Sequence, residues 1–253
     1  MKTVKIVLDL LLALLAVVLG YVLVYAVSAL FVDPARKCDR DNRYYRFLIE
    51  HAAHIAVPLA RIRLHLSGLE NVPEERFLLV GNHRSKFDPI LTWHALRGRQ
   101  LAFISKPENF KVPFFGRIVR RCGFMPIDRE DPRSAIVTVN EAAEKLKSGA
   151  FNIGVYPEGT RSKDCTLLPF HDGVFMIAKK AHVPVVVLAV RGTEEIRKHF
   201  PLRPTDVYLD VVDVIPAQEI ACMRTSLIGG RVYDDLQSAL AEEETDTHAV
   251  CTL

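Results

Sequence analysis

The stretch RFLLVGNHRSKFDPILTWHAL, residues 76–96, joins a strand signal, a polar loop and a helix signal in immediate succession. Its first part, 76–82, is an apolar run of the length of a buried strand. Its last part opens with Pro89, which suits the first turn of a helix, where an N–H group has no partner within the helix. The loop between them holds His83 and Asp88, five positions apart. A strand that leads into a helix through polar residues predicts an α/β unit with a ligand site at the carboxyl end of the strand.

Strand-like and helix-like segments alternate along most of the remaining chain. Residues 131–149 have apolar positions at helical spacing and end in Gly149, a typical C-terminal stop. Strands are expected at 151–157, 183–192 and 205–216, a helix at 174–182, and a short helix at 234–243 beyond Gly229 and Gly230. The pattern predicts one α/β domain with a mostly parallel central sheet flanked by helices, preceded by an N-terminal membrane-anchoring helical segment. We expect the anchor and an interfacial helix at 1–64, the α/β domain at 65–228, and a C-terminal helix with a polar tail at 229–253.

Composition excludes several classes of protein. The 253 residues are 49% hydrophobic and 25% charged, which is enough apolar side chain for a sizeable core and argues against a disordered chain. The formal net charge of +3 is too small to indicate a nucleic-acid partner. The 5 cysteines are odd in number and form no CxxC or Cys/His cluster at zinc spacing, so we expect a reducing compartment, no disulfide framework and no metal.

The N-terminus contains LLLALLAVVLGYVLVYAVSALFV, residues 10–32, without a charge. A helix of this length is about 35 Å long, and a hydrocarbon core is about 30 Å thick. A cleaved signal peptide is the alternative, but the length of the run and the DPARKCDR that follows favour an anchor. Basic residues gather just after the run and predict that the following domain lies on the cytoplasmic face of the cell membrane; they are Arg36, Lys37, Arg40 and Arg43.

The next segment, 44–64, mixes apolar residues with several charges, so it is not a simple second span. It reads either as an amphipathic helix at the membrane surface or as a core helix of the following domain, with Pro58 as a kink or an end. His51 and His54 lie three apart, a spacing that suits a metal, but no third ligand is evident and a solvated or interfacial face is the better interpretation.

The loop at 82–89 has two interpretations. Ser85 and Asp88 fit a capping box, or Asp88 is the N-cap ahead of Pro89, and either cap accounts for the aspartate without chemistry. Neither accounts for His83, whose imidazole can take a proton from a hydroxyl when a carboxylate fixes one ring nitrogen. The sequence of this loop leaves both interpretations open.

A second polar loop, YPEGTRS at 156–162, also follows an expected strand. In a parallel sheet it lies at the same edge as His83, where Gly159 allows a close backbone approach and Arg161 can bind a phosphate with two parallel hydrogen bonds. An ordinary turn with a surface ion pair is the alternative. Between the two loops, residues 103–130 combine six basic side chains with five phenylalanines, which suits an anionic amphiphile or an anionic membrane surface, or else a solvated basic helix.

Five motifs in this order carry a resemblance: NHRSKFD, KPENFKVPFFG, GFMPIDR, YPEGTRS and VPVVVLAV, over roughly residues 76–192. The chain resembles the glycerophospholipid acyltransferases, in particular the bacterial 1-acyl-sn-glycerol-3-phosphate acyltransferases. The resemblance implies a membrane-associated enzyme that moves a fatty acyl group from a thioester to the free hydroxyl of 1-acyl-sn-glycerol 3-phosphate, giving phosphatidic acid. His83 would be the general base and Asp88 would hold its imidazole. The substrate-binding residues would be Arg129, Glu158, Gly159, Thr160 and Arg161, to which we add Lys106 from the KPENFKVPFFG match.

The resemblance implies no bound cofactor and no metal, because the acyl group arrives on coenzyme A or on acyl carrier protein, and the donor stays open. The expected partners are the membrane bilayer, a lysophospholipid acceptor and acyl carrier protein, and no nucleic acid. The sequence departs from the usual pattern at Pro126, at Tyr156 in place of a phenylalanine, and at Val187 in place of a second proline. These departures bear on acyl-chain fit and acceptor preference more than on the chemistry.

Three alternatives compete with this interpretation. The acceptor could be another lysophospholipid or glycerol 3-phosphate itself. A hydrolase that used Ser85 with His83 is poorly supported, since the two lie only two residues apart and no G-x-S-x-G motif is present. A non-catalytic lipid-binding membrane protein would not need the histidine–aspartate pair.

Overall fold

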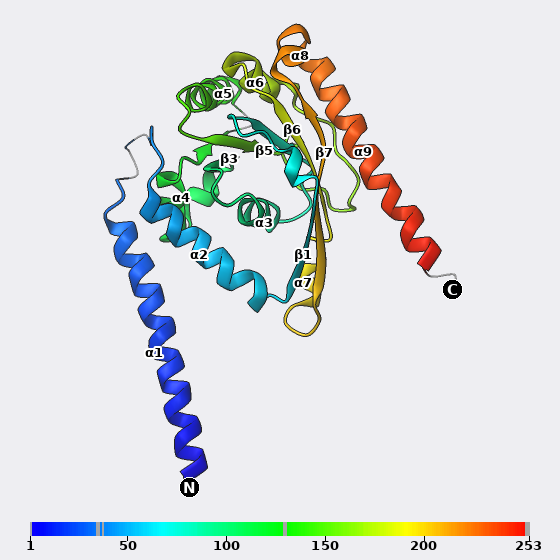
Figure 1. Cartoon of the computed structure of the whole chain (residues 1–253). Coiled ribbons are helices and arrows are strands. Elements are labelled where there is room, and N and C mark those ends of the chain that lie inside the picture. The colour runs from blue at the N-terminus through cyan, green and yellow to red at the C-terminus, as the bar shows by residue number, and fades with distance from the viewer. Residues whose placement is uncertain (1, 34–35, 37, 129–130, 251–253) are drawn as a thin grey trace.

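The structure, a computed structural model, describes residues 2–33, 36, 38–128 and 131–250, with side chains placed as far as Ala241. Its centre is a sheet in the order β1-β7-β6-β2-β5-β3-β4 (Figure 1). The strands are β1 (Ile62–Ser67), β2 (Leu78–Gly81), β3 (Leu101–Ser105), β4 (Met125–Pro126), β5 (Asn152–Val155), β6 (Val185–Arg191) and β7 (Thr205–Ile215). Neighbouring strands pair in parallel except β6 and β7, which are antiparallel. The expected mostly parallel sheet is confirmed.

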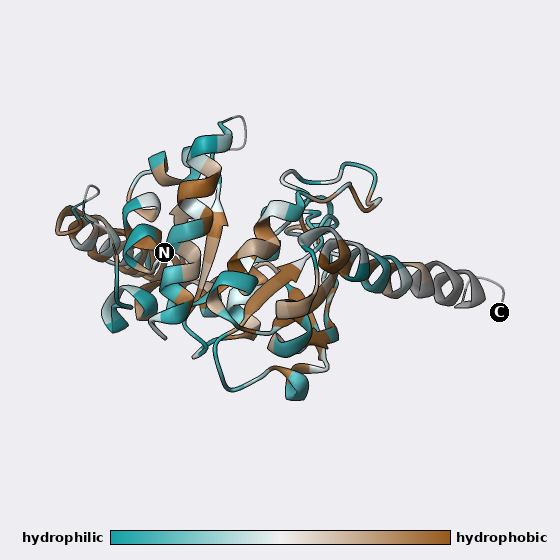
Figure 2. Ribbon diagram, turned by 90° about the horizontal axis from the view of Figure 1, so that it is seen from above, coloured by the Kyte–Doolittle hydropathy of each residue, from teal (hydrophilic) through white to brown (hydrophobic). Residues whose placement is uncertain are grey.

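Helices cover both faces of this sheet, so its central strands are apolar on both sides. The helices are α1 (Lys2–Leu30), α2 (Arg43–Leu59), α3 (Asp88–Ala95), α4 (Phe115–Arg121), α5 (Pro132–Lys147), α6 (Met176–Ala181), α7 (Ile196–His199), α8 (Ala217–Cys222) and α9 (Thr225–Val250), with short 3-10 turns η1 (Leu69–Asn71), η2 (Pro107–Lys111) and η3 (Asp172–Phe175). Figure 2 shows the hydrophobic strands enclosed between these helices.

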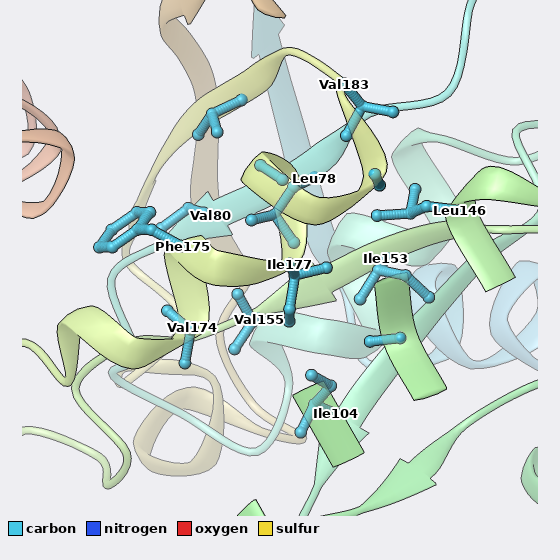
Figure 3. Close-up of a cluster of buried hydrophobic side chains, with 14 of the residues drawn as sticks. Leu78, Val80, Ile104, Leu146, Ile153, Val155, Val174, Phe175, Ile177 and Val183 are labelled. Atoms are coloured by element: carbon cyan, nitrogen blue, oxygen red, sulfur yellow. The ribbon is translucent and has the colours of Figure 1, made fainter. Parts of the chain in front are cut away.

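Strand β2 shows how side-chain alternation builds two cores. Leu78 and Val80 point to one face, where they meet Ile177 of α6 and Leu146 of α5 (Figure 3). Leu79 points to the other face, into a cluster that α2, α3 and α4 complete. Burying each such side chain stabilises the fold by about 1.5–3 kcal/mol. The two clusters hold β2 rigidly, and β2 carries the loop with His83.

Helix α1 stands apart from the rest of the fold over much of its length (Figure 1). Its residues from Lys2 to Gly20 are all exposed, and it is apolar and long enough to cross a membrane. Near its end the helix is fastened to α2: Tyr25 donates to the carbonyl of Leu48, and the hydroxyls of Ser28 and Tyr44 lie 2.7 Å apart. An N-terminal apolar helix, as expected, is present.

Helix α2 packs on the α/β domain with one face and exposes the other. Buried Arg46 pairs with Asp41 at 2.5 Å and donates to the carbonyls of Leu101 and Cys122, which ties α2 to β3 and α4. Phe47 on the opposite face is 58% exposed. The helix is therefore a packed element of the domain, as one of the two interpretations held, and Pro58 lies in its last turn, where it marks an end rather than a kink.

The C-terminal region differs from the prediction. The expected short helix at 234–243 is instead α9, which begins at Thr225 and runs through Gly229 and Gly230. Gly229 is required by close packing rather than by a helix stop, since a Cβ there would lie 2.2 Å from Oδ1 of Asp172. The proposed division of the chain near residues 64 and 229 stays a prediction.

Candidate active site

The loop after β2 brings His83 and Asp88 into contact. Nδ1 of His83 lies 2.7 Å from Oδ2 of Asp88, and the aspartate is completely buried, whereas the histidine side chain keeps 16% of its surface exposed. A carboxylate can only accept, so Nδ1 carries the hydrogen and Nε2 is left with its lone pair. The ring is fixed in the form that can take a proton.

Asp88 is held by more than the histidine. Its Oδ2 also accepts from the backbone N–H groups of Arg84 at 2.7 Å and Ser85 at 2.8 Å. Its Oδ1 accepts from the hydroxyl of Thr193 at 2.5 Å, in the loop after β6. The bond from the Ser85 N–H is one half of the expected capping box, but the Ser85 hydroxyl accepts from Phe87 instead of completing it. Asp88 thus orders the loop and orients the imidazole at once.

The second polar loop holds the backbone of His83 from both sides. The N–H of His83 donates to Oε1 of Glu158 at 2.5 Å, and the carbonyl of His83 accepts from the N–H of Ser162 at 2.9 Å. The His83 imidazole stacks on the ring of Tyr156, with centroids 4.5 Å apart and planes 14° apart. These contacts form because β2 and β5 are parallel neighbours, whose carboxyl ends meet at one edge.

Buried polar residues complete the support. Asn82 accepts from the N–H of Val190 at 2.8 Å and donates to its carbonyl at 2.9 Å, which fastens the start of the loop to β6. Arg84 is paired with Glu194 at 3.2 Å and also donates to the carbonyl of Cys165. Each of these bonds joins segments that are distant in the sequence.

Glu158 lies in the site, but its carboxylate is buried and already bonded. Oε1 accepts from His83 and Oε2 accepts from the N–H of Leu168 at 3.1 Å. Burial raises the pKa of Glu158 to about 7. The hydrogen bonds from the two backbone N–H groups limit this rise, because they stabilise the charged carboxylate. The structure shows Glu158 fastening two loops together, and the expected contact with substrate stays a prediction.

The other expected substrate-binding residues lie at the same edge of the sheet and are more open. Lys106 follows β3 and is exposed, and Thr160 and Arg161 are exposed beyond β5. Gly159 has φ of +72° and closes a turn onto the carbonyl of Tyr156, so the glycine is needed for the backbone conformation. Arg129 lies outside the described residues.

The sequence did not reveal three supporting residues: Asn82, Tyr156 as a stacking partner, and Thr193. Asn82 and Tyr156 lie inside the motifs, but nothing in the order of residues indicates what they contact. Thr193 lies 105 positions beyond Asp88, and a single threonine in a loop carries no signal. Only the strand order, which sets β6 beside β2, points to that loop.

The site is suited to removing a proton from a hydroxyl. It has an oriented imidazole whose Nε2 forms no hydrogen bond with the described residues, a buried carboxylate behind it, and exposed cations at the same edge that suit an anionic substrate. Among the described residues, His, Cys, Asp and Glu side chains form no group of three or more that could hold a metal.

Comparison with known proteins places the chain in a family. A family model described as Acyltransferase matches residues 63–191, about half of the chain. A chloroplastic 1-acyl-sn-glycerol-3-phosphate acyltransferase of Brassica napus is 38% identical over 161 residues, which cover 62% of this chain and 46% of that protein. The 1-acyl-sn-glycerol-3-phosphate acyltransferase alpha of Homo sapiens is 26% identical over 231 residues, covering 90% and 80%.

The fold has a solved counterpart. The crystal structure of the 1-acyl-sn-glycerophosphate acyltransferase PlsC from Thermotoga maritima superposes with a TM-score of 0.69 at 24% identity, covering 96% of this chain and 98% of that one. The chain spans about half the length of the plant relatives that it matches. The match of the family model includes both loops of the site, and the chain belongs to the acyltransferase family.

Proposed function

We propose that this protein is a membrane-associated 1-acylglycerol-3-phosphate O-acyltransferase, which moves a fatty acyl group from a thioester to the free hydroxyl of 1-acyl-sn-glycerol 3-phosphate and so makes phosphatidic acid. The observation that carries the proposal is the His83–Asp88 pair with its unengaged Nε2, in a chain of the acyltransferase family. The names of the relatives support the acceptor.

The proposed mechanism is direct acyl transfer with His83 as the general base. Nε2 of His83 takes the proton of the acceptor hydroxyl while its oxygen attacks the thioester carbonyl. The carbon–sulfur bond then breaks, and the protonated imidazole returns its proton to the leaving thiolate. Asp88 stabilises the imidazolium that forms between these steps, and the base supplies about 10²- to 10⁴-fold of the rate acceleration. The remainder comes from positioning and from stabilising the oxyanion.

Arg161 and Lys106 are proposed to bind the acceptor phosphate, together with Arg129, Gly159 and Thr160. Both Arg161 and Lys106 are exposed at the edge of the sheet that carries His83. The guanidinium of Arg161 suits the planar face of a phosphomonoester. The donor is acyl coenzyme A or acyl carrier protein, and no bound cofactor takes part.

The apolar helix α1 is proposed to place the protein at the cell membrane with the α/β domain on the cytoplasmic face. Basic residues follow α1 closely, in agreement with the positive-inside tendency.

The test is turnover by the purified protein in mild detergent with acyl coenzyme A or acyl carrier protein as donor. The acceptors are 1-acylglycerol 3-phosphate, glycerol 3-phosphate and lysophospholipids with larger headgroups. Phosphatidic acid made from the first acceptor, and lost in His83→Ala, supports the proposal. His65→Ala is the matched control, because His65 lies on edge strand β1 and pairs with Asp206 at 2.8 Å. Equal product from His83→Ala contradicts the base, and binding without turnover of any acceptor favours a lipid-binding protein.

A further inference from the structure

The segment between η2 and α4 has an unusual backbone and an apolar surface. Phe114 has φ of 59° and ψ of −55°, and the N–H of Phe115 donates to the carbonyl of Pro113 at 2.6 Å. This is a γ-turn of the strained kind, which a bulky residue rarely adopts. Val112, Phe114 and Phe115 are 46%, 43% and 42% exposed. Burial of these side chains in the core therefore does not compensate for the strain.

The turn is fixed rather than loose. Gly116 donates to the carbonyl of Val112 at 2.9 Å, and a Cβ on Gly116 would lie 2.2 Å from the carbonyl oxygen of Phe110. Only glycine allows η2 and the start of α4 to approach this closely. The exposed rings are consequently held in place by the backbone on both sides of the turn.

This apolar turn continues the apolar surface of α1. An open hollow of about 210 Å³ lies between the turn and the first two helices, lined by Tyr25, Ile49, Ala52, Pro113, Phe114, Phe115 and Ile118. Tyr25 lies on α1 next to Tyr21, at the point where the free part of the helix meets the domain. Tyrosines are enriched at the boundary between hydrocarbon and water. The turn therefore lies at the depth where α1 would leave the bilayer.

Charge around the turn matches an anionic lipid surface. Lys111 precedes the turn and Arg117 follows it, both exposed. Arg117 also donates to the carbonyl of Ala29 at 3.4 Å, which holds this side of α4 against the end of α1. Aromatic residues flanked by cations are typical of segments that enter the headgroup region.

We propose that residues 112–115, here called the phenylalanine turn, insert into the bilayer as a second membrane contact beside α1, and so press the catalytic edge of the sheet toward the lipid surface. The segment leaves the sheet at the carboxyl end of β3, the same edge that carries His83 after β2. Lys106 begins it. Insertion would shorten the path of an amphiphilic acceptor from the bilayer to His83. The inference concerns membrane contact and goes beyond the proposed acyl transfer, and its first measurement needs no turnover.

The experiment uses the full chain with Phe115→Trp, bound to vesicles of phosphatidylcholine and phosphatidylglycerol. The single native tryptophan, Trp93, is buried, so the wild type supplies the background emission. We expect vesicles to make iodide quenching of the added tryptophan roughly twofold weaker or more, and lipids brominated in mid-chain to quench it. Leu227→Trp is the control, because Leu227 is 59% exposed on α9, far from α1 (Figure 1). Its iodide quenching should not change.

Three results would overturn the inference. Unchanged iodide quenching of the tryptophan at position 115, as in the control, would show that the turn stays in water. Quenching by a brominated lysophospholipid monomer but not by brominated vesicles would show that the turn covers substrate instead. The variant Phe114→Ser/Phe115→Ser provides a second readout: it should keep turnover of a short-chain dissolved acceptor and lose at least part of the turnover of an acceptor presented in vesicles. Equal loss on both acceptors would also contradict the inference.

Discussion

Thr193 donates its hydroxyl hydrogen to Oδ1 of Asp88, the carboxylate oxygen that His83 does not use. The two oxygens of one buried carboxylate thus divide between Thr193 from the loop after β6 and His83, the proposed base, after β2. The Thr193–Asp88 bond is fully shielded, since both residues have no exposed surface.

Replacing Thr193 by valine should therefore lower kcat. The substitution keeps the shape and removes a hydrogen bond to a charged group, which contributes about 1.5–3 kcal/mol, so a loss of roughly 10-fold to 100-fold is expected if the bond orients Asp88 in the transition state. KM for the acceptor should change much less. Thr193→Ser keeps the hydroxyl and should restore the rate, whereas equal losses in both variants would mean that packing at this position matters and the hydrogen bond does not.

Arg161→Ala should raise KM for a phosphomonoester acceptor. The exposed guanidinium is proposed to bind the phosphate, and a charged hydrogen bond at an open site contributes on the order of 1 kcal/mol or somewhat more, which corresponds to a roughly 10-fold rise. Lys163→Ala is the control, because Lys163 is an exposed cation two positions further on. Initial rates against acceptor concentration measure the effect. A similar rise in both variants would indicate general attraction of anions instead of a specific phosphate contact.

The raised pKa of Glu158 predicts a pH-dependent stability. Its folded-state pKa is about 7 against an ordinary value of 4.5, so the folded protein binds this proton more tightly than the unfolded chain does. The stabilisation from this group is complete when the pH is below the ordinary pKa, and it is lost as the pH rises through the folded-state pKa. The loss in the free energy of unfolding is at most on the order of 3 kcal/mol. Urea unfolding in detergent at several pH values should show this fall for the wild type and not for Glu158→Gln.

Glu158→Gln also loses an acceptor for one of its two backbone N–H partners, which lowers the free energy of unfolding at every pH by about 1–3 kcal/mol. The informative quantity is therefore the change of the difference between the two proteins with pH. A difference that stays constant across the range would show that Glu158 does not titrate there.

The stack between His83 and Tyr156 predicts that the ring matters more than the hydroxyl. Tyr156→Phe retains the flat ring below the imidazole and loses only a long contact of 3.4 Å with Thr92, so the rate should fall less than about threefold. Tyr156→Ala removes the ring and leaves a cavity in a buried position, which should cost about 3–5 kcal/mol of stability and loosen the imidazole. A rate for Tyr156→Phe as low as that of the alanine variant would assign a direct role to the phenol.

The sheet was predictable because its central strands are apolar on both faces and therefore appear as continuous runs, as at 183–192 for β6. The carboxyl-edge position of His83 followed from the strand-to-helix order alone. The start of α9 was not predictable, because Gly229 in the sequence has the appearance of a helix stop and its reason, the approach of Asp172, exists only in three dimensions.

The roles of individual site residues were harder to predict than the location of the site. The pairing of His83 with Asp88 is local, five positions apart, and was anticipated. Glu158 was expected to bind substrate, which stays a prediction, and its carboxylate also accepts from the backbone of His83, 75 positions earlier. Sequence motifs identify which residues lie close together in the site. Whether a given residue contacts substrate or supports a loop depends on which of its atoms are already hydrogen-bonded.

Glu158 and Ser162, which hydrogen-bond to the backbone of His83, are synthesised well after it. The ribosome releases His83 long before these two residues, and the hydroxyl of Thr193 emerges later still. A nascent chain that ends before β5 therefore contains His83 but lacks the residues that hold its backbone in place. This is so whatever local structure β2 and α3 have reached. The proposed active site is therefore complete only late in translation, when most of the α/β domain has left the ribosome and β5 and β6 can dock on either side of β2.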